Sequence, residues 1–190
     1  MDYSKRKGMV KQYANRAEKI FNENQRNKNL AKKNYFLYEA FGKVNLAIET
    51  GGNTIVTARA YCVRAKIYKE LGDSKNAFHD IDKAIELNPG YIELYSIRAA
   101  FSVEEKRFNN AINDYSAVFE LSNGKDWKSL FEIGNIYYES EEYNKAIEYY
   151  TKTIDMFDAP SYIYGKRALA YTKTGKLQEA EKDKETDIVP

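Results

Sequence analysis

Few residues of this 190-residue chain have side chains that could catalyse a reaction or hold a metal ion. His79 is the only histidine and Cys62 the only cysteine, so the cluster of ligands that zinc requires cannot form. Acidic pairs such as Glu104 and Glu105 stand beside expected turns, where carboxylates are usually solvated. The chain has no glycine-rich phosphate loop and no Gly-x-Ser-x-Gly turn. The sequence therefore predicts no enzyme activity, no catalytic residue, no metal site and no cofactor.

Arginine side chains could bind an anion, and three of them recur in a fixed relation to an aspartate sixteen residues later. The pairs are Arg64 and Asp80, Arg98 and Asp114, and Arg167 and Asp183. Where the same spacing falls once more, on Ile133 and Tyr149, both charges are absent. Because the two charges appear and disappear together, we expect ion pairs within helix hairpins and not a row of anion sites.

These charges belong to a repeat with a period of about 34 residues. When the repeats are aligned under one another, the clearest column holds one alanine from each: Ala40, Ala77, Ala111, Ala146 and Ala180. With this alanine as place twenty, the repeats begin at Val10, Ala58, Ile92, Trp127 and Ser161. An internal period of this size predicts stacked helical units that present a surface.

Other columns agree with the alanine. Place eight is always small: Ala17, Ala65, Ala99, Gly134 and Ala168. Small residues at places eight and twenty let two antiparallel helices approach closely, while large residues at places four, eleven and twenty-four fill the space between hairpins. In these columns the chain resembles the tetratricopeptide repeat family over nearly its whole length. The resemblance implies an all-α fold, a right-handed α-solenoid of antiparallel helix hairpins.

We expect a single continuous domain of five hairpins. Residues 1–57 form an irregular first hairpin, residues 58–91, 92–126 and 127–160 form regular repeats, and residues 161–190 form a C-terminal capping hairpin.

The irregular first hairpin has eleven extra residues between Ala17 and Ala40. They fall in the polar stretch 22–34, which is either a protruding loop or an extension of both helices. At the place where three of the other repeats have aspartate, this hairpin has Lys43. We therefore expect Arg16 to lack the partner that the other arginines have.

The resemblance also implies a concave groove, lined by the first helix of each hairpin, that binds a partner. The candidate groove residues are Arg59, Val63, Lys66, Ile97, Ala100, Val103, Phe131, Asn135, Tyr138, Lys166 and Leu169. A largely apolar run with a charged rim suits a short peptide or helix. In the alternative reading, some of these residues contact other parts of the chain or are simply exposed. The Lys and Asn clamp with which chaperone-binding family members hold a C-terminal carboxylate is not matched.

The chain carries a formal net charge of +2, and the basic excess lies in residues 1–50, with eleven Lys and Arg against five Asp and Glu. The function expected from the resemblance is a scaffold that binds a protein or peptide of unspecified identity. The alternatives are a self-assembling, homo-oligomeric module and, less favoured, nucleic-acid binding through the basic N-terminal region. No apolar run approaches the ~20 residues of a membrane span. With its single cysteine, the chain is expected to be cytoplasmic and without a membrane partner.

Overall fold

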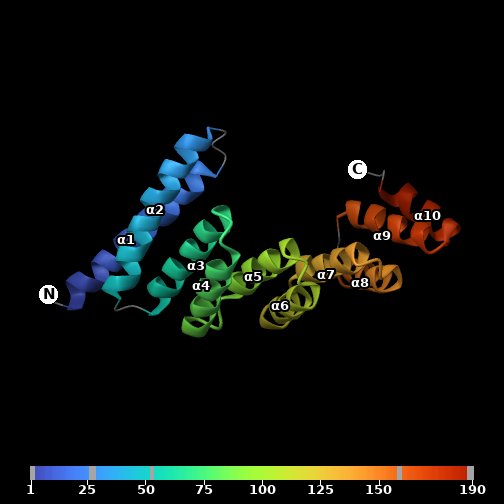
Figure 1. Cartoon of the computed structure of the whole chain (residues 1–190). Coiled ribbons are helices and arrows are strands. Elements are labelled where there is room, and N and C mark those ends of the chain that lie inside the picture. The colour runs from blue at the N-terminus through green and yellow to red at the C-terminus, as the bar shows by residue number, and fades with distance from the viewer. Residues whose placement is uncertain (1–2, 26–28, 52–53, 158–159, 188–190) are drawn as a thin grey trace. The chain divides into compact units, whose positions relative to one another are not determined.

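The structure is a computed structural model that describes residues 3–25, 29–51, 54–157 and 160–187. Within these residues it contains ten α-helices and no strand, which confirms the predicted all-α class (Figure 1). The chain divides into two compact units, Met1–Leu94 and Tyr95–Pro190. The single continuous domain and the residue bounds of its five hairpins stay predictions.

The first unit contains two helix hairpins. Helix α1 (Tyr3–Asn24) pairs with α2 (Leu30–Thr50), and α3 (Thr54–Glu70) pairs with α4 (Ser74–Leu87). Helix α5 (Ile92–Glu104) begins at the end of this unit.

The second unit continues the pattern. Helix α5 is followed by α6 (Phe108–Leu121), α7 (Trp127–Glu139) pairs with α8 (Tyr143–Met156), and α9 (Tyr162–Lys173) pairs with α10 (Leu177–Asp187).

The alanine column lies at the centre of the hairpins. Ala40, Ala77, Ala111, Ala146 and Ala180 are all buried. The small residues at place eight are buried as well. Because neither column carries a long side chain, the two helices of a hairpin lie close together, and larger residues pack above and below the contact.

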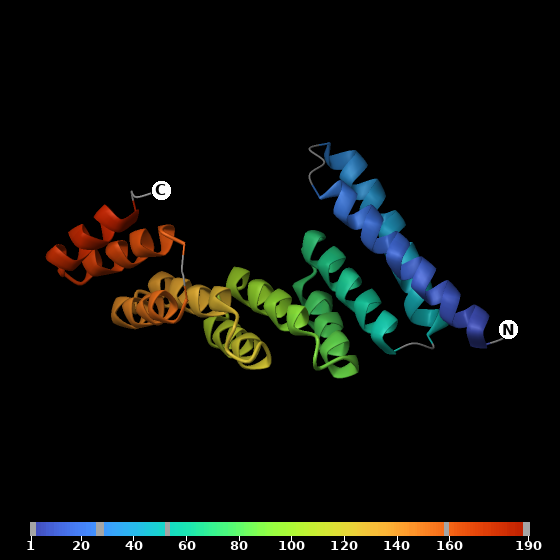
Figure 2. The ribbon, with the colours of Figure 1, turned by 180° about the vertical axis from the view of Figure 1, so that it is seen from behind.

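The extra residues of the first hairpin extend both of its helices. Within the polar stretch, α1 continues to Asn24 and α2 begins at Leu30. Helix α2 therefore has 21 residues, whereas α8, the second helix of a regular hairpin, has 14. Asn29 caps the start of α2 by accepting a hydrogen bond from the backbone N–H of Lys32. Residues 26–28 of the polar stretch lie outside the described residues. The two long helices run side by side in both views (Figure 2), and Leu37, Ile20 and Phe21 join their buried core.

Each turn between the helices of the four later hairpins contains a residue with left-handed backbone. Gly72 and Gly175 have φ angles of 79° and 78°, while Lys106 and Glu141 have 56° and 63°. In every case the next backbone N–H donates to a carbonyl five residues earlier, as in the bond from Arg107 to Ser102. This is the Schellman way of ending a helix, which favours glycine at the left-handed residue.

Candidate functional site

The three arginines bind the aspartates predicted from their spacing. In each pair the guanidinium donates from Nε and Nη2 to the two carboxylate oxygens, at distances between 2.6 and 2.9 Å. Asp80, Asp114 and Asp183 are buried. The expected ion pairs within hairpins are confirmed, and these guanidinium groups are engaged inside the fold.

The place-four and place-eleven tyrosines also contact these arginines, which the sequence reasoning did not identify. Arg64 lies over the rings of Tyr61 and Tyr68, at 5.3 and 5.9 Å from their centroids. Arg167 lies over Tyr164 and Tyr171 in the same way, at 5.5 and 5.7 Å. A tyrosine three residues before and another four residues after an arginine share its helix face, and that spacing was the available signal.

Two of the arginines also bond to the preceding hairpin. Arg64 Nη1 donates to Asn45 Oδ1 of α2 at 2.8 Å, and Arg167 Nη1 donates to Thr151 Oγ1 of α8 at 3.0 Å. Each of these two guanidinium groups therefore fixes both its own hairpin and the stacking of that hairpin on the preceding one.

In the first unit, the candidate groove residues are largely occupied by internal contacts. Arg59 on α3 forms an ion pair with Glu18 on α1. Val63 is buried in the core that α1, α2 and α3 share. Lys66 is half-buried, near the buried thiol of Cys62. This part of the predicted groove faces α1, so it offers little apolar surface.

In the second unit, exposure varies among the candidates. Ala100 on α5 is exposed, and Ile97 and Val103 are half-buried. On α9, Lys166 is exposed and Leu169 is 50% exposed.

Helix α7 contributes the most buried candidate of this unit. The ring of Phe131 is only 7% exposed and packs against Trp127, Tyr150 and Tyr162, with centroids 6.4, 5.8 and 5.5 Å away. Phe131, a candidate groove residue, is therefore largely enclosed, because α7 packs its ring on Tyr150 of α8. Its edge contact with Tyr162 of α9 nevertheless brings the first helices of successive hairpins together.

Asn135, also on α7, is held by two hydrogen bonds. Its side-chain amide donates to Glu132 Oε2 at 3.1 Å, and its carbonyl oxygen accepts from the Tyr150 hydroxyl at 2.9 Å. Burial raises the pKa of Tyr150. Tyr138, one helical turn further, is half-buried and packs edge-on against Tyr143 at 5.3 Å.

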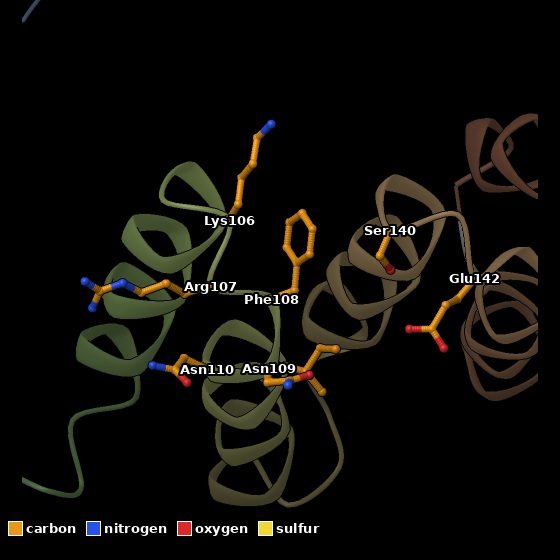
Figure 3. A pocket seen from close by; sticks show the side chains of 8 residues that line it. Lys106, Arg107, Phe108, Asn109, Asn110, Ser140 and Glu142 are labelled. Atoms are coloured by element: carbon orange, nitrogen blue, oxygen red, sulfur yellow. The ribbon is translucent and has the colours of Figure 1, made fainter.

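A cavity of about 450 Å³ lies between the α5–α6 turn and the α7–α8 turn. Phe108 stands between the turns, Ser140 and Glu142 line the far side, and Arg107 and Asn110 extend away from Glu142 (Figure 3). These polar groups do not converge on one point, so the cavity offers no arrangement for catalysis.

The described residues contain no group of three or more His, Cys, Asp and Glu side chains that could hold a metal ion. Cys62 is buried, and burial raises the pKa of its thiol. Over the same part of the chain, no helix is both long and apolar enough to cross a membrane.

Comparison with known proteins agrees with the repeat geometry. The tetratricopeptide repeat pattern matches residues 58–91 and 128–157. The chain is a tetratricopeptide-repeat protein. Mouse DnaJ homolog subfamily C member 7 is 28% identical to this repeat protein over 167 residues, which cover 84% of the chain. The chain spans about a third of the length of that relative.

Solved structures share the fold of this tetratricopeptide-repeat protein. MamA from Desulfovibrio magneticus has a TM-score of 0.74 at 16% identity, covering 95% of this chain and 93% of MamA. YrrB, described as a TPR protein with an unusual peptide-binding site, has a TM-score of 0.64 at 17% identity, covering 84% of this chain and 80% of YrrB. At these identities the likeness shows the fold alone, that of a tetratricopeptide-repeat solenoid.

Proposed function

We propose that this chain is a protein-interaction scaffold, and that the first-helix surface of its second unit binds a peptide or short helix of a partner protein. We call this surface the α5–α7–α9 surface. It consists of Ile97, Ala100, Val103, Phe131, Asn135, Tyr138, Tyr162, Lys166 and Leu169.

The observation that carries this proposal is the contact between Phe131 of α7 and Tyr162 of α9. It joins the first helices of two hairpins, which is the arrangement a continuous binding surface needs. Tyr162 is itself 46% exposed and Leu169, seven residues further along the same face of α9, is 50% exposed. Large apolar side chains that lie two helical turns apart on one surface are suitable anchors for a peptide.

The charged rim supports the same proposal. Lys166 lies on α9 between the two exposed apolar residues, and Lys128 packs near the ring of Trp127 at the start of α7. Asn135 donates a hydrogen bond to Glu132 and accepts one from the Tyr150 hydroxyl. These half-buried bonds hold the side chains of α7 and α8 in place, which lowers the entropy cost of binding. Peptide binding by YrrB is a precedent for this function on the same fold.

The experiment uses peptides selected from a random library on the immobilised wild-type chain. Their affinity is then measured for Leu169→Asp and for the control Leu177→Asp. Leu177 lies on the second helix of the same hairpin and is 65% exposed, so both variants place the same charge at an exposed leucine. We expect Leu169→Asp to lose roughly tenfold or more in affinity, the effect of removing one apolar anchor.

Equal affinity for both variants would reject the α5–α7–α9 surface. Light scattering on the wild-type chain tests self-assembly separately. A homo-oligomer that Leu169→Asp dissociates would mean that a second copy, and not a peptide, occupies this surface.

A further inference from the structure

The first hairpin contains a cavity of about 370 Å³ lined by Gln12, Tyr13, Arg16, Glu39 and Lys43. Gln12, Tyr13 and Arg16 come from one face of α1, and Glu39 and Lys43 lie one turn apart on α2. Arg16 is exposed. Within the described part of the chain, neither Arg16 nor Lys43 forms an ion pair or hydrogen bond, as expected from the sequence for Arg16. Two cations therefore face this cavity with one carboxylate.

The last hairpin has a cavity of about 360 Å³ at the same repeat places. Tyr164, Arg167 and Glu179 there correspond to Tyr13, Arg16 and Glu39. The decisive difference is at place twenty-three, where the last hairpin has Asp183 and the first has Lys43. Asp183 binds Arg167 through both carboxylate oxygens, at 2.7 and 2.8 Å.

The repeated architecture thus provides an internal reference for the first hairpin. In three hairpins, the arginine at this place binds a carboxylate supplied by the second helix. In the first hairpin the second helix supplies the ammonium group of Lys43 at that place, so Arg16 lacks the bidentate carboxylate partner that the other three arginines have.

We propose that this cavity, the Arg16–Lys43 site, binds the carboxylate of an acidic side chain from a partner protein. The carboxylate of an incoming Asp or Glu would bind Arg16 as the carboxylate of Asp183 binds Arg167, and it would also lie next to the ammonium group of Lys43. The site lies in the first unit and does not depend on the α5–α7–α9 surface, so it goes beyond the function proposed above.

The surroundings favour an acidic peptide with apolar residues over a nucleic acid. Tyr35 and Leu46 follow the same face of α2 as Glu39 and Lys43, and they are 66% and 42% exposed. They offer apolar contact beside the cations. A row of phosphates would meet the Glu39 carboxylate in the cavity, whereas a single carboxylate between Arg16 and Lys43 balances the local charge.

The test uses the full chain and a fluorescein-labelled peptide of alternating glutamate and leucine, with binding followed by fluorescence anisotropy. In Lys43→Asp, the second helix supplies the carboxylate that three of the other hairpins have. We expect this variant to bind the peptide roughly tenfold more weakly and to unfold at a higher temperature, because the new carboxylate pairs with Arg16. Arg16→Ala should weaken binding by a similar factor without the gain in stability.

Lys11→Asp is the matched control for charge. Lys11 is exposed on α1 and lies on another face of the helix than Arg16. This variant should retain peptide affinity to within about twofold, and so should Leu169→Asp, which tests the other surface. Equal loss in Lys11→Asp and Lys43→Asp would overturn the proposal in favour of general charge attraction. Tighter binding of a labelled oligothymidine, lost in Lys43→Asp, would overturn it in favour of nucleic acid.

Discussion

At the scale of single residues, two of the recurring arginines, Arg64 and Arg167, combine three kinds of contact. Arg64 forms a bidentate ion pair with Asp80, lies over two tyrosine rings and bonds to Asn45 of the preceding helix. Ion pairs on a protein surface contribute little, but a guanidinium that is partly desolvated and held by several groups is costly to disrupt.

The pair of Arg98 and Asp114 allows this coupling to be measured. Asp114 is buried and Arg98 is 27% exposed. In a double-mutant cycle with alanine, the free energies of unfolding should reveal an interaction of roughly 0.5–3 kcal/mol. The control is a second cycle that combines Arg98→Ala with Asp155→Ala, which removes an exposed carboxylate on α8. In this cycle the changes in free energy of unfolding should be additive. Additivity in both cycles would show that the predicted pairing does not stabilise the hairpin.

Gly134 is required by the close approach of an aromatic ring. A Cβ atom at this residue would lie 2.7 Å from both Cδ1 and Cε1 of Tyr150. This ring is buried, so the packing around it would have to shift. Gly134→Ala should therefore lower the free energy of unfolding by about 1–3 kcal/mol. Gly165→Ala is the control, because its Cβ would meet only the exposed end of the Asp187 side chain. Denaturant unfolding that leaves the two variants equally stable would contradict this packing.

The raised pKa of Tyr115 leads us to expect that the folded state loses stability at alkaline pH. Burial, with smaller contributions from Glu132 and Asp114, raises the pKa of its phenol from 10.0 to about 12. Since the folded state holds the proton more tightly, stability is intact below pH 10 and falls as the pH rises from about 10 to about 12. Tyr115→Phe should reduce this fall in denaturant midpoints. An unchanged slope in the variant would mean that Tyr115 is accessible to solvent when folded.

At the scale of helices and turns, the four later hairpins share one helix-ending motif but differ in the residue that carries it. Gly72 and Gly175 adopt the left-handed backbone without a Cβ clash, whereas Lys106 and Glu141 adopt it with a side chain. The repeat geometry therefore determines the backbone conformation of the turn, and the residue type determines how much free energy that conformation costs.

Replacing Lys106 by glycine should stabilise the second unit. Relief of the left-handed strain outweighs the greater freedom of glycine in the unfolded chain, for a net gain of about 1 kcal/mol or less. The reverse change, Gly72→Lys, should cost a similar amount at the corresponding turn. Thermal unfolding of both variants checks the signs, and a destabilised Lys106→Gly would show that its side chain makes a stabilising contact in the turn.

At the scale of the whole molecule, burial is unevenly distributed among the helices. Six residues of α7 are buried, including Leu130, Ile133 and Ile136. Helix α10 buries only Ala180 and Asp183 among its described side chains. Helix α10 therefore leaves most of its side chains exposed to solvent.

This difference predicts a gradient of local stability along the second unit. Amide hydrogen exchange, measured by mass spectrometry, should be fastest in α10 and slowest in α7, because the helix with fewer buried contacts opens at lower free energy. The peptides of α8, packed between α7 and α9, provide the internal comparison and should resemble α7. Uniform exchange across α7 to α10 would mean that the unit opens only as a whole.

Periodicity in the sequence was sufficient to predict the helices, their pairing and the ion pairs. These features depend on contacts between residues at fixed spacings, so the alanine column and the recurring arginines and aspartates identify them directly. Lys43 in place of aspartate likewise indicated the unpaired Arg16. The identity of a partner has no such local signature, and it is left to the binding experiments.

Side-chain burial and long-range contacts were decided only by the tertiary structure. Whether stretch 22–34 forms a loop or longer helices depends on packing between α1 and α2, not on the polarity of the stretch itself. Phe131 occupies a place predicted to line the groove, yet Tyr150 and Tyr162 enclose its ring. A repeat pattern indicates which residues share a helix face, but the sizes of the neighbouring side chains determine how deeply each one is buried.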